Sequence, residues 1–174
     1  MSYILNIESS TTNCSISLAN NGKLISIREF NEKNYSHSTK MHSFIEEVLK
    51  NSNISVNKLS AIAVSSGPGS YTGLRIGVSA AKGLCYALQV PLISVPTLKV
   101  LARQINIKGK DLIIPVLDAR RDEVYSAVYN SKYELVRNIF PEIIDSESFI
   151  ELAKENKLYF IGNGQEKCER LIRK

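Results

Sequence analysis

The stretch SSGPGSYTGLRIGVSAAKGL, residues 65–84, decides the fold of this chain. A run of branched aliphatic residues at 59–64 predicts a strand, the Gly-Pro-Gly at 67–69 predicts a turn, and a helical pattern follows over 72–89. Backbone N–H groups at such a strand-to-helix turn can hold an anion. The segment has no Gly-Lys-Ser/Thr of a P-loop, and Thr72 stands where a dinucleotide-binding loop has its third glycine. Two readings stay open: an anion site, and a tight turn that lets the helix pack closely.

Two stripes of residues run along the helix expected at 72–89. One is small, with Gly73, Gly77 and Ala80 spaced three or four residues apart, and small residues let another helix approach closely. The other is apolar and consists of Leu74, Val78, Ala81, Cys85 and Leu88. We expect the apolar stripe to cover the chain's own sheet and the small stripe to face a partner. The alternative is that both stripes cover the sheet.

Upstream of this helix, the chain opens with two or three antiparallel strands. Residues 14–19 and 23–30 alternate in hydropathy, and Asn20-Asn21-Gly22 between them is a strong hairpin signal. Residues 38–51 switch to a helical period. Its apolar stripe is formed by Met41, Phe44, Ile45, Val48 and Leu49.

Downstream, a strand to residue 95 and a short helix at 97–104 complete the first lobe, and a second, smaller lobe follows. Its elements are an apolar strand at 112–117, two further strands to 140, a helix at 146–155, a strand at 159–161 and a final helix. This order predicts an α/β fold with mixed sheets flanked by helices, in lobes spanning 1–104 and 105–174.

Composition places the chain among soluble globular proteins, since 44% of its 174 residues are hydrophobic. The net charge of +5 permits a nucleic-acid surface, but the basic residues are scattered, and a solvated surface is the alternative. Its three cysteines lie far apart, which fits reduced thiols in a cytoplasmic protein better than a disulfide framework or a zinc site. No signal peptide and no apolar run of about 20 residues is found, so we expect no membrane contact.

Candidate catalytic groups are few. The only histidines, His37 and His42, are five residues apart and would point about 140° apart on a helix, so they do not form a metal-binding pair. No GxSxG nucleophile motif is present, and Asp118 at a strand end is the one good candidate for a kinase base. The sequence thus predicts no catalytic residue and no metal site.

Five segments in chain order resemble the TsaB family of tRNA threonylcarbamoyladenosine biosynthesis subunits. They are ILNIESSTTNCSISLANNG, YSHSTKMHSFIEEVL, SSGPGSYTGLRIGVSAAKGL, LISVPTLKVLA and LDARRDEVYSAVY. The resemblance implies an actin/hexokinase/Hsp70-like fold, which is ribonuclease H-like, and a non-catalytic role beside a TsaD-type transferase. It further implies a TsaE-type ATPase in the assembly, a homodimer when the chain is alone, and indirect tRNA contact. TsaD-type proteins carry a HxxxH metal pair where this chain has Thr97 and Leu101.

The family resemblance also implies sites. A partner interface is expected on the first two helices, and a nucleotide, ATP or ADP, is possible at that interface or near Ser9, Ser10, Thr11 and Thr12. Glu8 replaces the aspartate common in relatives, and the family usually continues beyond residue 174. An ATP-dependent small-molecule kinase and a glycopeptidase-like hydrolase are the alternatives to a scaffold subunit. The expected interface residues are Met41, Phe44, Ile45, Val48, Ser70, Tyr71, Gly73, Leu74, Gly77, Ala80 and Ala81.

Overall fold

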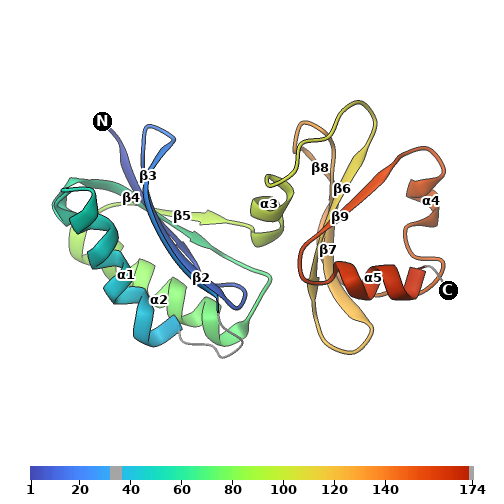
Figure 1. Ribbon diagram of the computed structural model, residues 1–174, viewed down its shortest axis with the longest axis horizontal. Helices are drawn as coiled ribbons and strands as arrows, with labels where there is room; N and C mark the ends of the chain where they lie inside the picture. The colour runs from blue at the N-terminus through green and yellow to red at the C-terminus, as the bar shows by residue number, and fades with distance from the viewer. Residues whose placement is uncertain (32–36, 173–174) are drawn as a thin grey trace. The chain divides into compact units, whose positions relative to one another are not determined.

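The computed structural model describes residues 1–31 and 37–172, and it divides into two compact units, Met1–Thr97 and Leu98–Lys174 (Figure 1). The division falls earlier than the expected boundary after residue 104. Leu98 and Ala102 are fully buried in a core that also contains Ile113, so the short helix packs with the second unit.

A five-stranded mixed sheet forms the first unit. Its strands are β1 (Tyr3–Glu8), β2 (Asn13–Asn20), β3 (Lys23–Asn31), β4 (Leu59–Ser65) and β5 (Leu92–Val95). The order is β3-β2-β1-β4-β5, with the first three strands antiparallel and β1, β4 and β5 parallel. This is the strand order of a ribonuclease H-like fold, which is the fold that the family resemblance implies.

The β2–β3 hairpin turns at Asn21 and Gly22, where φ is 48° and 79°. Both residues tolerate positive φ, which explains why the Asn-Gly pair predicts this hairpin correctly.

Helices α1 (His37–Asn51) and α2 (Tyr71–Leu88) both pack on this sheet and lie beside each other (Figure 1). A short 3-10 turn, η1 (Val56–Lys58), precedes β4. The core between the helices and the sheet is aliphatic and includes Leu5, Ile16, Leu18, Met41, Val48 and Ile62, each fully buried.

The second unit contains a four-stranded mixed sheet in the order β8-β7-β6-β9. Its elements are α3 (Thr97–Ala102), β6 (Leu112–Asp118), β7 (Glu123–Tyr129), β8 (Leu135–Ile143), α4 (Ile150–Ala153), β9 (Leu158–Ile161) and α5 (Gln165–Ile172). One core joins the sheet to α4 and α5, and another joins it to α3. The prediction of a helix over 146–155 is too long. Asp145 and Ser148 hydrogen-bond in a turn, and Phe149 is left-handed (φ 65°), so the helix begins only at Ile150.

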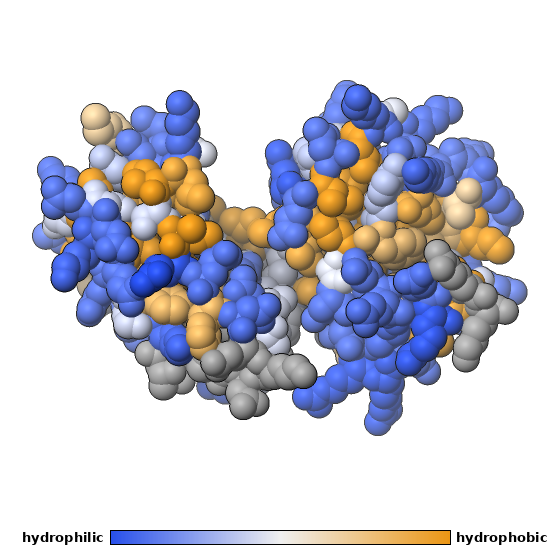
Figure 2. Space-filling model, viewed as in Figure 1, coloured by the Kyte–Doolittle hydropathy of each residue, from blue (hydrophilic) through white to orange (hydrophobic). Residues whose placement is uncertain are grey.

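Hydrophobic side chains also reach the surface of both units, between larger hydrophilic areas (Figure 2). Two tyrosines near the ends of α2, Tyr71 and Tyr86, are 74% and 82% exposed. Among the described helices, none is both long and apolar enough to cross a membrane.

Candidate interaction surface on helices α1 and α2

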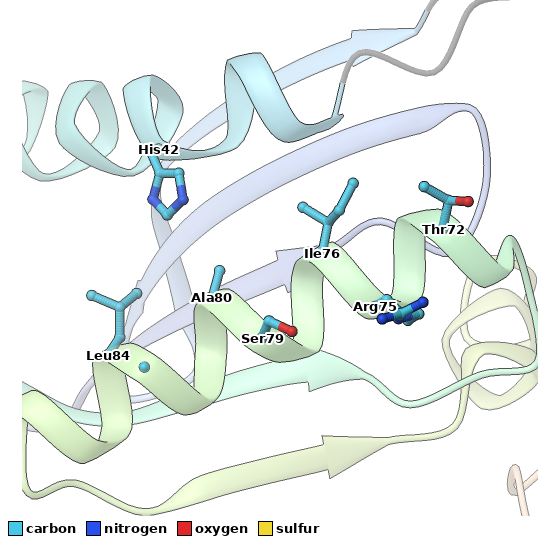
Figure 3. Close-up of a pocket in the computed structure, with 8 residues that line it drawn as sticks. His42, Thr72, Arg75, Ile76, Ser79, Ala80 and Leu84 are labelled. Carbon is cyan, nitrogen blue, oxygen red and sulfur yellow. The ribbon is translucent and has the colours of Figure 1, made fainter.

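A groove of about 710 Å³ follows the outer side of α2 next to α1. In Figure 3, His42 points from α1 toward α2, while Ile76, Ala80 and Leu84 rise from α2 on the side of α1. The lining residues are His42, Thr72, Arg75, Ile76, Ser79, Ala80, Gly83 and Leu84.

The groove combines an apolar strip with small residues and polar edges. Ile76, Ala80 and Leu84 are half-buried and supply the apolar surface. A Cβ added at Gly83 would meet no heavy atom within 4 Å beyond its own helix, so the surface is open there. An apolar strip with a small residue at an open position suits a packed helix, whose backbone can approach closely.

Two of the three residues in the small stripe of α2 face the chain's own sheet, which corrects the expectation that the stripe as a whole faces a partner. Gly73 and Gly77 are buried, whereas Ala80 is half-buried and lines the groove. A Cβ at Gly77 would lie 2.2 Å from the Oγ atom of Ser9, and the Ser9 hydroxyl donates a hydrogen bond to the Gly73 carbonyl at 2.9 Å. The small residues are needed because the β1–β2 turn lies directly against α2.

The apolar stripe of α1 is likewise covered by its own unit. Met41, Ile45 and Val48 are buried in the core beneath α1, so they offer no surface to another protein. Of the expected interface residues, Tyr71 is exposed, and Phe44, Ser70, Leu74 and Ala80 are partly exposed. Ala80 is the one that lines the groove. An interface on these two helices stays a prediction, but its surface consists largely of other residues.

Sequence reasoning missed seven of the groove residues: His42, Thr72, Arg75, Ile76, Ser79, Gly83 and Leu84. A signal for them exists. Residues 72, 75, 76, 79, 80 and 83 recur at intervals of three and four along α2, which marks a third face of the helix. Polar and small residues interrupt the apolar side chains on that face, so it does not stand out in a search for apolar stripes.

The β1–β2 turn, where a nucleotide was expected, is engaged within the chain. Ser9 and Ser10 are 0% and 2% exposed. Besides the bond from Ser9 to Gly73, the Ser10 carbonyl accepts a hydrogen bond from the backbone N–H of Ser70 at 2.6 Å. Thr11 is half-buried and Thr12 exposed. Two of the four expected hydroxyl groups are therefore unavailable to a phosphate in this conformation.

The side chain of Glu8 fixes this turn through hydrogen bonds. One carboxylate oxygen accepts hydrogen bonds from the backbone N–H and the hydroxyl of Ser10, at 2.7 and 2.5 Å. The other oxygen accepts a hydrogen bond from the Ser65 hydroxyl at the end of β4. The carboxylate thus connects the β1–β2 turn to the C-terminal end of β4, where the loop that leads to α2 begins.

Asp118, the candidate base of a kinase, is ion-paired. Its Oδ1 atom accepts a hydrogen bond from the Nζ atom of Lys167 and another from the backbone N–H of Arg120 at 2.7 Å. Desolvation opposes ionisation, but the bonds from Lys167 and Arg120 outweigh it and hold the pKa of the Asp118 carboxyl below its ordinary value. A carboxylate stabilised in this way is a weak base, which does not favour the kinase alternative.

The positions that correspond to the transferase metal pair hold side chains unsuited to a metal. Thr97 is buried and Leu101 is half-buried, and an isobutyl group cannot act as a ligand. Within residues 1–31 and 37–172, no group of three or more His, Cys, Asp or Glu side chains is placed to bind a metal ion.

Fold and surface together define a class: a ribonuclease H-like α/β protein whose first unit presents a groove between two sheet-covering helices. The chain belongs to the family described as TsaD, tRNA N6-adenosine threonylcarbamoyltransferase, whose model matches residues 31–174. Within this family it is similar to TsaB proteins. It is 34% identical to the Bacillus subtilis tRNA threonylcarbamoyladenosine biosynthesis protein TsaB over 141 residues, which is 79% of this chain and 61% of that protein. The predicted resemblance to TsaB is thereby confirmed.

Two further similarities add to this. The structure of YeaZ from Pseudomonas aeruginosa matches with a TM-score of 0.73 and 28% identity, over 85% of this chain and 69% of that one. The tRNA N6-adenosine threonylcarbamoyltransferase of Anoxybacillus flavithermus is 42% identical over 59 residues, which is 34% of this chain and 17% of that protein. The chain spans 54% to 61% of the length of three curated TsaB relatives.

Proposed function

We propose that this chain is a non-catalytic subunit in the biosynthesis of tRNA threonylcarbamoyladenosine and that it binds a tRNA N6-adenosine threonylcarbamoyltransferase through the groove between α1 and α2. The transferase carries out the chemistry, and this chain supports it. A TsaE-type ATPase in the same assembly and a homodimer of the isolated chain remain predictions.

The observation that carries the proposal is the open face of α2. Its inner side packs against the sheet, whereas Arg75, Ser79 and Gly83 on its outer side are exposed and line the groove. Exposed tyrosines near both ends of the helix, Tyr71 and Tyr86, add large amphipathic side chains of the kind that anchor protein interfaces.

The chemistry of the described residues supports a scaffold over an enzyme. Asp118 is ion-paired, and Thr97 and Leu101 cannot replace a histidine pair. The kinase and hydrolase alternatives therefore have no observation in their favour.

Gly83→Arg tests the proposal without disturbing the fold. The new side chain has open space at Cβ, and replacing glycine inside a helix favours the helical state. We expect the wild-type chain to form a complex with the purified transferase in sedimentation velocity, and Gly83→Arg to weaken that complex by at least about tenfold, because a long charged side chain blocks close helix approach.

Asn57→Arg is the matched control, since it adds the same side chain at an exposed residue outside the groove. Circular dichroism should show a thermal transition for Gly83→Arg at a temperature at least as high as that of the control, because the substitution removes a glycine from the helix. Binding of Gly83→Arg with wild-type affinity would refute the proposed docking surface.

A further inference from the structure

Charge on the outer face of α2 is of one sign. Arg75 and Lys82 are the only charged residues in the 18 residues of this helix, and both are exposed. Seven residues separate them, so they lie within about 20° of each other around the helix, two turns apart. A partner helix on this face of α2 therefore meets the guanidinium group of Arg75, which lines the groove, and the ammonium group of Lys82, which is exposed beside it.

The neighbouring helix does not balance this charge within the groove. His42 is the residue of α1 that lines it. Of the two carboxylates on α1, Glu47 is ion-paired with Arg28 of β3 at 2.6 Å, and Glu46 is exposed one turn beyond His42, outside the lining. The described part of the groove thus contains cationic and neutral side chains and no carboxylate.

We propose that this surface selects its partner by charge: the groove takes a helix of another protein that carries carboxylates opposite Arg75 and Lys82, in preference to a second copy of this chain. The inference rests on the proposed docking function and specifies the chemistry of the partner.

Symmetry gives the reason for the preference. In a two-fold pairing of identical chains, the same patch meets itself, so Arg75 and Lys82 of one copy face a surface that carries the same two cations and, within the described groove lining, no carboxylate. Glu46 is the exposed carboxylate nearby on α1 and can offset part of this repulsion. A partner with carboxylates at the facing positions removes the repulsion and gains attraction, and like-charge contacts are a common means of rejecting wrong partners.

The test is charge reversal. The double variant Arg75→Glu with Lys82→Glu should bind the transferase at least about tenfold more weakly than the wild type, because attraction becomes repulsion at both positions. Glutamate, arginine and lysine have similar helix propensities, so α2 should stay intact. The control is Lys108→Glu with Lys110→Glu, which changes the net charge equally at exposed residues of the second unit.

Salt provides a second readout. Raising the salt concentration from about 50 mM to about 500 mM should weaken the wild-type complex several-fold and weaken the complex of the double variant less, because the favourable charge contacts are screened only in the wild type. In sedimentation experiments on the chain alone, self-association should be weaker than binding to the transferase.

The outcomes separate this inference from the function on which it rests. If Gly83→Arg abolishes binding while the double reversal binds like the wild type, the groove is the interface and charge selection is wrong. If both variants bind normally, the docking surface itself is wrong. A wild-type homodimer through α2 that is tighter than the complex with the transferase would also overturn charge selection.

Discussion

Two glycines of α2 lie on different faces of the helix, one against the sheet and one toward solvent. Gly77 lies against Ser9 with no room for a methyl group, whereas Gly83 faces open space. The sequence alone presents both as small residues in one helix. What separates them is the position of the β1–β2 turn, which depends on the hydrogen bonds of Ser9 and Ser10 to residues 60 and more positions away. For this reason the residue pattern predicts that α2 packs closely against another element, but it does not predict that this element is the β1–β2 turn.

Alanine at the two glycines should therefore have opposite effects. Gly77→Ala places a Cβ 2.2 Å from the Ser9 Oγ atom and should lower the free energy of unfolding by about 1–3 kcal/mol, through overpacking and loss of the Ser9–Gly73 hydrogen bond. Gly83→Ala should raise it by about 0.5–1 kcal/mol, because alanine favours the helix.

Urea denaturation of both variants measures this difference. Adding Ser9→Ala to Gly77→Ala removes the clashing hydroxyl and should recover part of the loss. Equal stability of Gly77→Ala and Gly83→Ala would contradict the close packing of α2 on the β1–β2 turn.

At the scale of elements, hydropathy period and turn residues predict most helices and strands with their order. The Asn-Gly hairpin, the strand before residue 65 and the helix after it are all where the sequence places them. Two kinds of information are missing from the pattern. Apolar stripes such as Met41, Ile45 and Val48 show that a helix has a buried face, but not that its own sheet fully covers that face. The groove face of α2, with Thr72, Arg75 and Ser79, can be recognised only after the structure has shown which residues of α2 pack against the sheet.

The end of β6 is joined to α5 by the ion pair of Asp118 with Lys167. Because the folded-state pKa of Asp118 is lowered, its contribution to stability is complete above the unfolded-state pKa of about 4 and is lost as pH falls through the folded-state value. Asp118→Asn should therefore lose stability relative to the wild type at pH 7, and this difference should shrink as the pH is lowered below about 4.

Thermal unfolding of the wild type and of Asp118→Asn, measured from pH 7 to below about 4, tests this pH dependence. Asp122→Asn is the control, since Asp122 is 61% exposed and lies 3.6 Å from Arg170, where solvent screens the pair. A difference between wild type and Asp118→Asn that does not change with pH would show that the Asp118 carboxylate is not held by Lys167.

At the scale of the whole molecule, two units with separate cores carry one candidate surface, on the helices of the first unit. The family could be predicted from the sequence through the resemblance, and the comparisons confirm it. Most of the residues that line the groove could not be predicted, because the apolar residues that mark a helix for packing are the ones that the sheet of its own unit covers.

Hydrogen–deuterium exchange with and without the purified transferase tests the central claim most directly. Docking in the groove predicts slower amide exchange in residues 71–88 of α2 and 40–51 of α1 when the partner is present, with β6–β9 unchanged, because a packed partner helix stabilises the two helices that it contacts. A complex that forms without any slowing in α1 and α2, or that protects only other segments, would contradict it.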